Sequence, residues 1–186
     1  MLLGISRSLQ QHLLASIPNS ASSDWVVIGA LQHDEPLNLP TGKLVVFLYA
    51  IEENPFLRNR PPVANDAGDF VPAPLALTLQ YMITYVSAEA TDVQEWLTEV
   101  LRVFSSSPRL APAQLHTDLH GVVDQLVVRL RTPSVEELNR LWTALNVGMR
   151  LALFYEVDAA LIPATDPETV GPVERRRLIL TGDPAA

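Results

Sequence analysis

Carboxylate, amide and guanidinium side chains gather in residues 52–60, which read EENPFLRNR. Glu52 and Glu53 are candidate acid–base groups, because active sites often lie where a strand ends. Neighbouring side chains of a strand point to opposite faces, so these two carboxylates cannot face each other without a second chain segment. Two interpretations remain open here. One is a hydrolase with Glu52, Asn54 and Arg58 at its site, and the other is a structural corner in which a glutamate pairs with an arginine.

A second group of potential ligands is His116 and His120, which stand four residues apart and would share one side of a helix. Asp118 is the only nearby third ligand, and residues 112–121 lack the apolar spacing of a helix. The chain has no cysteine, and it contains no phosphate-binding loop, dinucleotide fingerprint, or serine or zinc hydrolase motif. We therefore expect no metal, no cofactor and no enzyme activity.

The charge balance restricts the partners. With 13 basic and 21 acidic residues the formal net charge is −8, which disfavours general binding to nucleic acid because such binding depends on a basic surface. The one basic cluster, Arg175, Arg176 and Arg177, is interpreted as solvating this part of the chain or meeting an acidic partner. No apolar run reaches the ~18 to 20 residues that span a bilayer, so we expect a soluble chain without a membrane anchor or signal peptide.

The polar residues 52–60 follow the strongest strand pattern in the chain. Every residue from 44 to 51 is apolar and most are β-branched or aromatic, which is typical of a strand covered on both faces and predicts the centre of a sheet. Pro55 ends this strand because a proline cannot continue a central ladder. Residues 60–73 are rich in proline and are predicted to form a long surface loop without regular structure.

Apolar spacing predicts the other elements. Two of the expected helices begin with capping-box patterns, Thr91 with Gln94 and Ser134 with Glu137. One expected strand, residues 25–31, is a short apolar run, and three others alternate apolar with small or polar residues. Residues 75–85 should have one face on the core, residues 126–131 should be half exposed or face a partner through their arginines, and residues 151–157 should keep one side in contact with water. The predicted helices are residues 2–16, 91–104 and 135–145, and the predicted strands are residues 25–31, 75–85, 126–131 and 151–157.

These elements give the order α-β-β-β-α-β-α-β. We expect the α/β (α+β) class, with a single domain in residues 1–162 whose mixed sheet of about five strands carries three helices. Residues 163–186 are interpreted as a flexible C-terminal arm, because prolines, a glycine and small polar residues precede the segment 175–180, RRRLIL. An apolar triplet in such an arm is expected to dock on its own domain or on a neighbour.

Several blocks of the sequence, taken in order, resemble one known family. The blocks are YAIEENPFLRN from residue 49, PLALTLQYMIT from residue 74, SVEELNRLW from residue 134 and LFYEV from residue 153. They are similar to the N-terminal domain of the tail-cap proteins, or tail terminators, of extracellular contractile injection systems, which are phage-tail-like particles of the anti-feeding-prophage type. The chain departs from the family at Ala50, where an arginine is more usual, and near Thr98, where a glycine is more typical.

The resemblance implies a structural role. Family members close the distal end of the inner tube and the last layer of the sheath as a ring, which is expected to be a hexamer. The implied partners are further copies of this chain, the inner tube protein and the sheath protein. Such a subunit would assemble in the cytoplasm and join a particle that can be released outside the cell. The alternatives are the hydrolase described above and an adaptor that binds a peptide along an exposed strand.

A ring subunit needs faces that bind the next copy at a fixed rotation, and charged strand residues can prevent further strands from adding. This requirement selects candidate interface residues in three places. They are Glu52, Glu53, Asn54, Arg58 and Asn59 at the corner, Arg129, Arg131, Glu156 and Asp158 on the strands or their edges, and Arg175, Arg176, Arg177, Leu178 and Ile179 in the arm.

Overall fold

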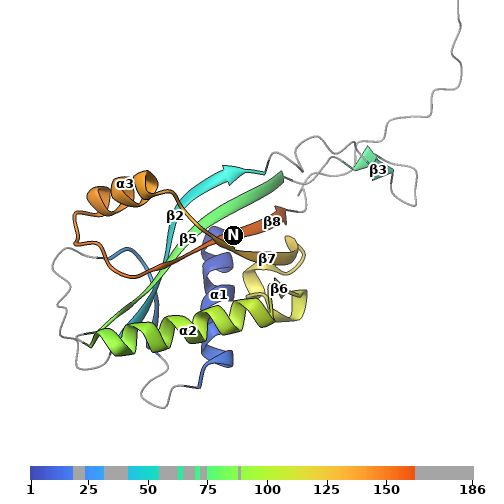
Figure 1. Ribbon diagram of the computed structural model, residues 1–186. Coiled ribbons are helices and arrows are strands. Elements are labelled where there is room, and N and C mark those ends of the chain that lie inside the picture. The colour runs from blue at the N-terminus through green and yellow to red at the C-terminus, as the bar shows by residue number, and fades with distance from the viewer. Residues whose placement is uncertain are drawn as a thin grey trace, which may run out of the picture.

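The structure, a computed structural model of the chain, describes residues 1–18, 24–31, 42–54, 63–64, 70–71, 75–87 and 89–161 (Figure 1). Its helices are α1 (Leu2–Ser16), α2 (Ala90–Ser106) and α3 (Val135–Leu145), with two short 3₁₀ helices, η1 (Pro112–Gln114) and η2 (Thr117–Leu119). Its strands are β1 (Val26–Ile28), β2 (Lys43–Glu53), β3 (Val63–Ala64), β4 (Phe70–Val71), β5 (Leu75–Val86), β6 (Arg109–Leu110), β7 (Val123–Arg131) and β8 (Leu153–Leu161). The predicted α+β class and the order of its main elements are confirmed, with β3, β4 and β6 as additional short strands.

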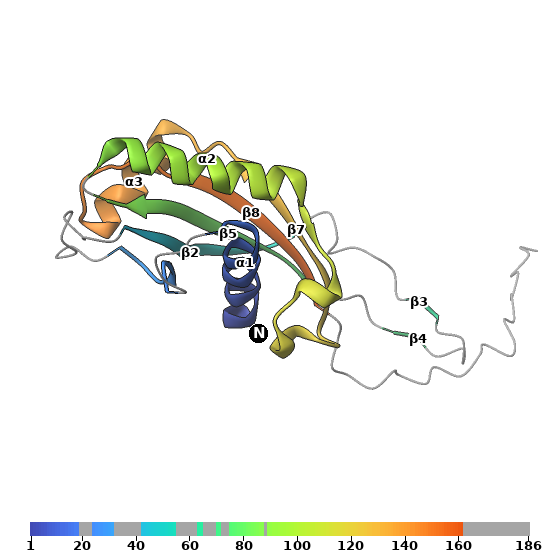
Figure 2. The same ribbon diagram turned by 90° about the horizontal axis from the view of Figure 1, so that it is seen from below.

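Six strands form one mixed sheet in the order β1-β2-β5-β8-β7-β6. β1 pairs with β2 in parallel, and the other pairs of this sheet are antiparallel. Figure 2 shows β2, β5, β8 and β7 side by side in one curved layer. The expectation that the apolar run 44–51 forms the centre of the sheet was wrong, because β2 lies next to the edge strand β1 and the centre is β5 with β8. The unbroken apolar run reports cover on both faces of the strand, and it carries no information about how many strands lie beyond it.

α1 and α2 cover one face of the sheet. Ile5, Leu9 and Leu13 of α1 are at most 1% exposed, and they share a core with Val100 and Phe104 of α2. The apolar stripe that three- and four-residue spacing gives each helix is the side that packs here. The sheet contributes alternate residues of β2, β5, β8 and β7 to the same core.

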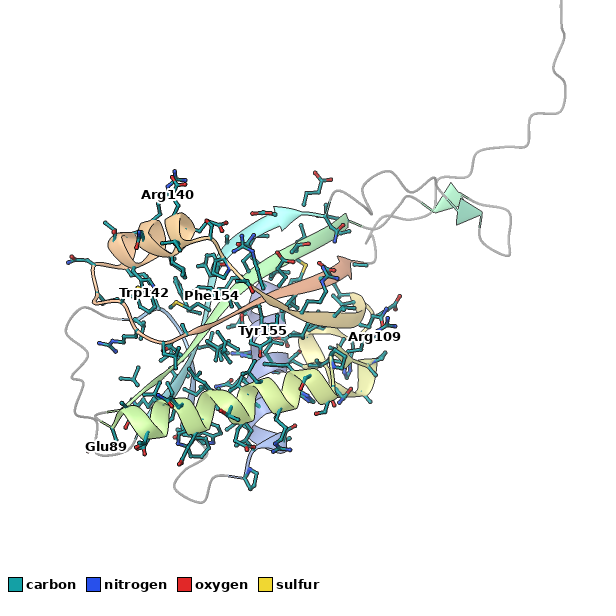
Figure 3. The ribbon with its side chains drawn as sticks, in the orientation of Figure 1. Glu89, Arg109, Arg140, Trp142, Phe154 and Tyr155 are labelled. Carbon is teal, nitrogen blue, oxygen red and sulfur yellow. The ribbon has the colours of Figure 1, made fainter. Side chains whose placement is uncertain are left out.

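α3 covers only part of the opposite face (Figures 1 and 3). Trp142 of α3 and Phe154 of β8 lie in this second core, each 5% exposed, together with Met82 of β5. The predicted capping box starts the helix: the Ser134 hydroxyl accepts the N–H of Glu137 at 3.2 Å, and the Glu137 carboxylate accepts the N–H of Ser134 at 2.7 Å. The capping box therefore fixes the beginning of α3, and Trp142 packs the helix on the sheet. The rest of this face of the sheet is not covered by α3.

Two predictions of local secondary structure were wrong. α2 begins at Ala90, so Thr91 lies inside the helix and does not cap it. Instead, the Ser87 hydroxyl accepts the N–H of Glu89 at 3.2 Å and donates to the Asp92 carboxylate at 3.1 Å, which ties the preceding strand to the first turn. Residues 60–73 were expected to be irregular, but they contain the antiparallel pair β3–β4, which needs only two residues from each side.

The prediction that β5 has one face on the core was also wrong, because β5 is covered on both faces over most of its length. Met82 and Thr84 are fully buried on the face opposite the main core. α3 covers Met82, and Thr84 donates a hydrogen bond to the backbone carbonyl of Leu151 at 2.8 Å, which satisfies its buried hydroxyl. β8 begins two residues later than predicted, at Leu153, and Leu151 is 55% exposed.

Candidate interface on the open face of the sheet

Beyond the end of α3, the face of the sheet that this helix covers becomes polar. On β5, Gln80 and Thr78 lie two and four residues before Met82. On β8, Glu156 and Asp158 lie two and four residues after Phe154. Because side chains alternate between the faces of a strand, these four lie on the α3 side. Gln80 is paired with Glu156 and Thr78 with Asp158 in the register. With residues of β2 and β7 they form a group that we name the polar ladder: Glu52, Asn54, Thr78, Gln80, Arg129, Arg131, Glu156 and Asp158.

A β-bulge brings Glu52 to this face. The register of β2 with β5 shifts between Leu48 and Ala50, so that Tyr49 is the extra residue. Since side chains alternate, an unbroken strand would place Glu52 on the same face as Leu44 and Leu48, against the main core. The shift places Glu52 opposite Thr78 instead, and its Oε1 accepts a hydrogen bond from Gln80 Nε2 at 2.8 Å.

Asp158 is the most strongly held carboxylate of the polar ladder. Its Oδ1 accepts hydrogen bonds from Thr78 Oγ1 at 2.8 Å and from Asn54 Nδ2 at 3.3 Å. Its Oδ2 lies 2.6 Å from Arg129 Nη2. Both oxygens are thus engaged, and only 15% of the side chain is exposed, so its position relative to β5, β7 and the end of β2 is fixed.

Arg131 connects the polar ladder to α3. Its Nη1 donates to the Tyr49 hydroxyl at 3.2 Å, its Nη2 to Glu137 Oε1 at 2.5 Å, and its Nε lies 3.3 Å from Glu156 Oε1. These partners use the planar donor geometry of a guanidinium, which a lysine could not reproduce. The hydrogen bond to Glu137 is the main reason why the pKa of Arg131 is raised above its usual value.

Glu137 has two roles in this arrangement. The backbone N–H of Ser134 and then the guanidinium of Arg131 lower the pKa of its carboxyl to about 2. The same side chain therefore caps α3 and anchors Arg131, and it stays ionised well into the acidic range. Burial raises the pKa of Tyr49, and this effect exceeds the opposing effect of the nearby Arg131.

A cavity of about 300 Å³ lies between α3 and the polar ladder, and we name it the α3 pocket. Its walls include the apolar side chains of Leu138 and Leu141 from α3 and Phe154 from β8. Gln80 and Arg131 line it on the side of the polar ladder. The pocket is thus a mostly apolar space next to a charged surface. Figure 3 shows Arg140 on the outer side of α3, with Trp142 and Phe154 beneath the helix.

The structure brings together six of the residues selected from the sequence, namely Glu52, Asn54, Arg129, Arg131, Glu156 and Asp158. Those of β8 lie on a face of the sheet and not along an edge, since β8 pairs with β5 and β7 on its two sides. Glu53 is opposite Leu77 and points to the other face, as expected for the neighbour of Glu52. Arg58, Asn59, Arg175, Arg176, Arg177, Leu178 and Ile179 lie outside the described residues.

Sequence reasoning missed Tyr49, Thr78 and Gln80 as members of this site and its border. For Thr78 and Gln80 a signal was present, because both stand at polar positions of the alternation in residues 75–85. No such signal existed for Tyr49, since its role depends on the bulge. Glu137 was identified only as a cap, and its contact with Arg131 depends on how α3 is placed over β7.

The two histidines considered as metal ligands make local contacts. His116 Nδ1 accepts the N–H of Asp118 at 3.3 Å, and His120 Nε2 lies 3.3 Å from the carbonyl oxygen of Leu115. They border a 3₁₀ turn and do not lie on an α-helix. Within the described part of the chain, no three histidine or acidic side chains are grouped in a way that would hold a metal ion. None of the described helices has the length and apolarity needed to cross a bilayer.

Comparisons with known proteins relate the chain to one family. Residues 4–176 match the family model described as the Pvc16 N-terminal domain. No curated protein matches the chain.

Two solved structures resemble the chain. One is the sheath/tube terminator, in the extended state, of an extracellular contractile injection system named PVC, with a TM-score of 0.66 and 19% identity over 100% of this chain and 64% of that one. The other is the anti-feeding prophage cap, a tube terminating cap, with a TM-score of 0.63 and 22% identity over 97% of this chain and 62% of that one. This chain therefore spans slightly less than two thirds of either structure, and at such identities the likeness demonstrates a shared fold.

Proposed function

Because this chain belongs to the Pvc16 N-terminal domain family, we propose that it is a cap subunit, or tail terminator, of a phage-tail-like contractile injection system. In this role it closes the distal end of the inner tube and of the sheath as a ring of identical subunits, which we take to be a hexamer. It assembles in the cytoplasm, binds the tube and sheath proteins, and catalyses no reaction. The observation that carries the proposal is the likeness of the fold, over nearly the whole chain, to a sheath/tube terminator and a tube terminating cap.

The polar ladder is suited to be one of the contacts between subunits. Arg129 keeps 51% and Glu156 31% of its side chain exposed, so both can reach a neighbouring molecule. Their positions are already fixed by partners inside the domain, which reduces the conformational entropy that binding would remove. Charges held on a rigid sheet favour one orientation of the next copy over others, as a ring with a fixed rotation requires.

The remaining selected residues are proposed contacts as well. Arg58 and Asn59 follow β2 directly along the chain, and residues 175–179 combine three positive charges with apolar side chains. We assign this arm segment to a neighbouring subunit or the sheath in the assembled particle. Deleting residues 165–186 should then leave a folded domain that joins particles poorly. Normal particles from the truncated chain would contradict this assignment.

The contacts give no support to the hydrolase alternative. Glu52 accepts a hydrogen bond from Gln80, and Asn54 donates to Thr78 and Asp158, so these groups tie neighbouring strands together. Asn54 is only 6% exposed, so of these two side chains only that of Glu52 is accessible to a substrate. No observation favours a second function.

The proposal is tested by producing the chain together with its tube and sheath proteins and examining the assemblies by negative-stain electron microscopy and by light scattering. We expect closed rings at the ends of tubes. Arg129→Glu should reduce ring closure, because it replaces the partner of Asp158 by a second carboxylate at an exposed position. Arg102→Glu is the matched control, since Arg102 is also exposed and paired, but lies on α2 and contacts Glu99.

The experiment tests the cap function and the role of the polar ladder separately. If the wild-type chain never forms a closed ring with its partners, the cap function is wrong. If rings form and Arg129→Glu closes them as well as Arg102→Glu does, the cap function stands and the polar ladder is not the contact. Circular dichroism of both variants checks that each one is folded.

A further inference from the structure

The α3 pocket and the polar ladder form a continuous surface whose occupant can be identified within this chain. We propose that residues 175–180, RRRLIL, dock on their own domain in the free subunit, with the arginines over the carboxylates of the polar ladder and the leucines in the α3 pocket. The inference concerns the subunit before assembly, so it does not depend on the proposed function.

The receptor has an apolar part and a polar part that share a border. Phe154, Leu138 and Leu141 supply apolar walls to the α3 pocket, whose volume of about 300 Å³ accommodates aliphatic side chains. Gln80 and Arg131 line the pocket and also belong to the polar ladder. A ligand that fills the pocket can therefore place a polar or charged group over the polar ladder next to its apolar one.

The charge of the receptor favours a basic ligand. Four carboxylates lie on this surface, those of Glu52, Glu137, Glu156 and Asp158. Three guanidiniums oppose them, those of Arg129, Arg131 and, at the rim of the pocket, Arg140, which also pairs with Glu136. The surface thus keeps an excess of negative charge. The triplet 175–177 is the only run of basic residues in the chain, and an apolar triplet follows it directly. Basic and apolar residues are therefore adjacent in this segment, just as the polar ladder and the apolar pocket are adjacent on the receptor surface.

The order and spacing of the charged and apolar residues in the segment 175–180 also agree with those of the receptor surface. Starting from the end of β8 and moving back along it, one meets the carboxylates of Asp158 and Glu156 first and the pocket wall Phe154 afterwards. A chain that returns from the end of β8 over this face passes the same features in that order, and in the segment the arginines precede the leucines. In an extended segment Arg176 and Leu178 point to the same side, two residues apart, as Glu156 and Phe154 do.

The connecting chain is long enough for this return. Residues 162–174 can span up to about 45 Å when extended. The distance along β8 from its end to Asp158 is only about 10 Å. The connection therefore closes without strain, and the entropic cost of closing such a loop grows only slowly with its length.

Disulfide trapping in the full-length chain tests the inference, because the chain contains no cysteine of its own. Leu180→Cys is combined with Leu141→Cys in the pocket or, with less disturbance of packing, with Arg140→Cys at its rim. The matched control combines Leu180→Cys with Glu95→Cys, an exposed position on α2 at the other face of the sheet. Under a mild thiol oxidant we expect an intramolecular disulfide with residue 140 or 141 to form about tenfold faster than with residue 95, which corresponds to about 1.4 kcal/mol.

Two further substitutions test the alternation in the Arg140→Cys, Leu180→Cys background. Leu178→Asp should slow trapping about tenfold, because a carboxylate would enter the pocket, while Ile179→Asp on the opposite side of the segment should change it less than about twofold. Equal trapping by residues 95 and 140, or equal effects of the two aspartates, would overturn the inference. A disulfide that forms only between two molecules, seen as a dimer on a non-reducing gel, would also overturn it, because the segment would then bind a second copy.

Discussion

α3 should detach from the sheet while the rest of the domain stays folded when Trp142 is replaced by alanine. The structure describes every residue of α3, and Trp142 is the only one of them that is buried, at 5% exposure. The side chains of Leu138, Leu141 and Leu145 pack on the same core but are only partly buried. Trp142 is therefore the largest single apolar contribution to the attachment of the helix.

The expected loss follows from the buried area. A buried tryptophan removes ~150–250 Å² from water, which at ~25 cal/mol per Å² gives about 4–6 kcal/mol. A compact unfolded chain lowers this value by ~10–40%, to about 2–5 kcal/mol, a range that overlaps the ~3–5 kcal/mol measured for large-to-small aromatic substitutions. Domains of this kind have total stabilities of ~5–15 kcal/mol, so the loss is large enough to release α3 and small enough to leave the main core folded.

Trp142→Phe is the informative companion variant. The indole Nε1 of Trp142 is buried and has no hydrogen-bond partner among the described residues. An unsatisfied buried donor costs about 1–3 kcal/mol, and both substitutions remove this penalty, but phenylalanine keeps most of the buried area whereas alanine loses it. We expect Trp142→Phe to be close to neutral, in contrast to Trp142→Ala.

Hydrogen exchange followed by mass spectrometry measures both effects separately for each segment. Peptides from residues 135–145 should lose protection in Trp142→Ala and keep it in Trp142→Phe, while peptides from residues 75–86 should remain protected in both. Val135→Ala serves as the control, since Val135 is 74% exposed. If β5 loses protection together with α3, or if Trp142→Ala behaves like Val135→Ala, the reasoning about a separately attached helix is refuted.

Two further predictions concern the packing of the main core. His12 packs against Phe104, and burial lowers the pKa of its imidazole below 6.5. The unfolded chain therefore binds more protons than the folded one, so the free energy of unfolding should fall as the pH is lowered through about 6.5. The urea midpoint of His12→Gln should not show this decline. Gly42→Ala should lower the free energy of unfolding by about 1–3 kcal/mol, which a lower urea midpoint would show. The added Cβ would lie within 3 Å of the Tyr85 ring and hydroxyl. Gly29→Ala, with nothing within 4 Å of its Cβ, should be nearly neutral, and equal effects of the two alanines would contradict the argument.

The sequence was sufficient to predict most elements but not the arrangement of the strands. The stripe of Ile5, Leu9 and Leu13 and the capping box at Ser134 are local patterns, and the structure confirms both. The position of β2 in the sheet is decided by contacts between segments far apart in the chain, such as β5 with β8. Periodicity describes which faces of a segment are covered, and it is silent on which neighbours lie beside it.

The polar ladder was only half predictable for the same reason. Arg129, Arg131, Glu156 and Asp158 could be selected as charged strand residues, because alternation places them away from the apolar side. That Glu52 joins them depends on the bulge at Tyr49, which moves the charge from one face of β2 to the other. A single extra residue thus decides whether the corner contributes to the site, and nothing in the apolar run reveals it.

The size of the elements explains why such a surface exists. α3 has 11 residues and is therefore about 16 Å long, whereas β5 with 12 residues extends over about 40 Å. A helix of this length leaves much of the face uncovered. A face in contact with water alone would need only scattered polar side chains, yet Asp158 and Arg131 are held at 15% and 21% exposure by several partners each. Partly burying charges costs free energy that pairing only offsets, so the fixed positions of these charges support the proposal that the polar ladder is a contact between subunits.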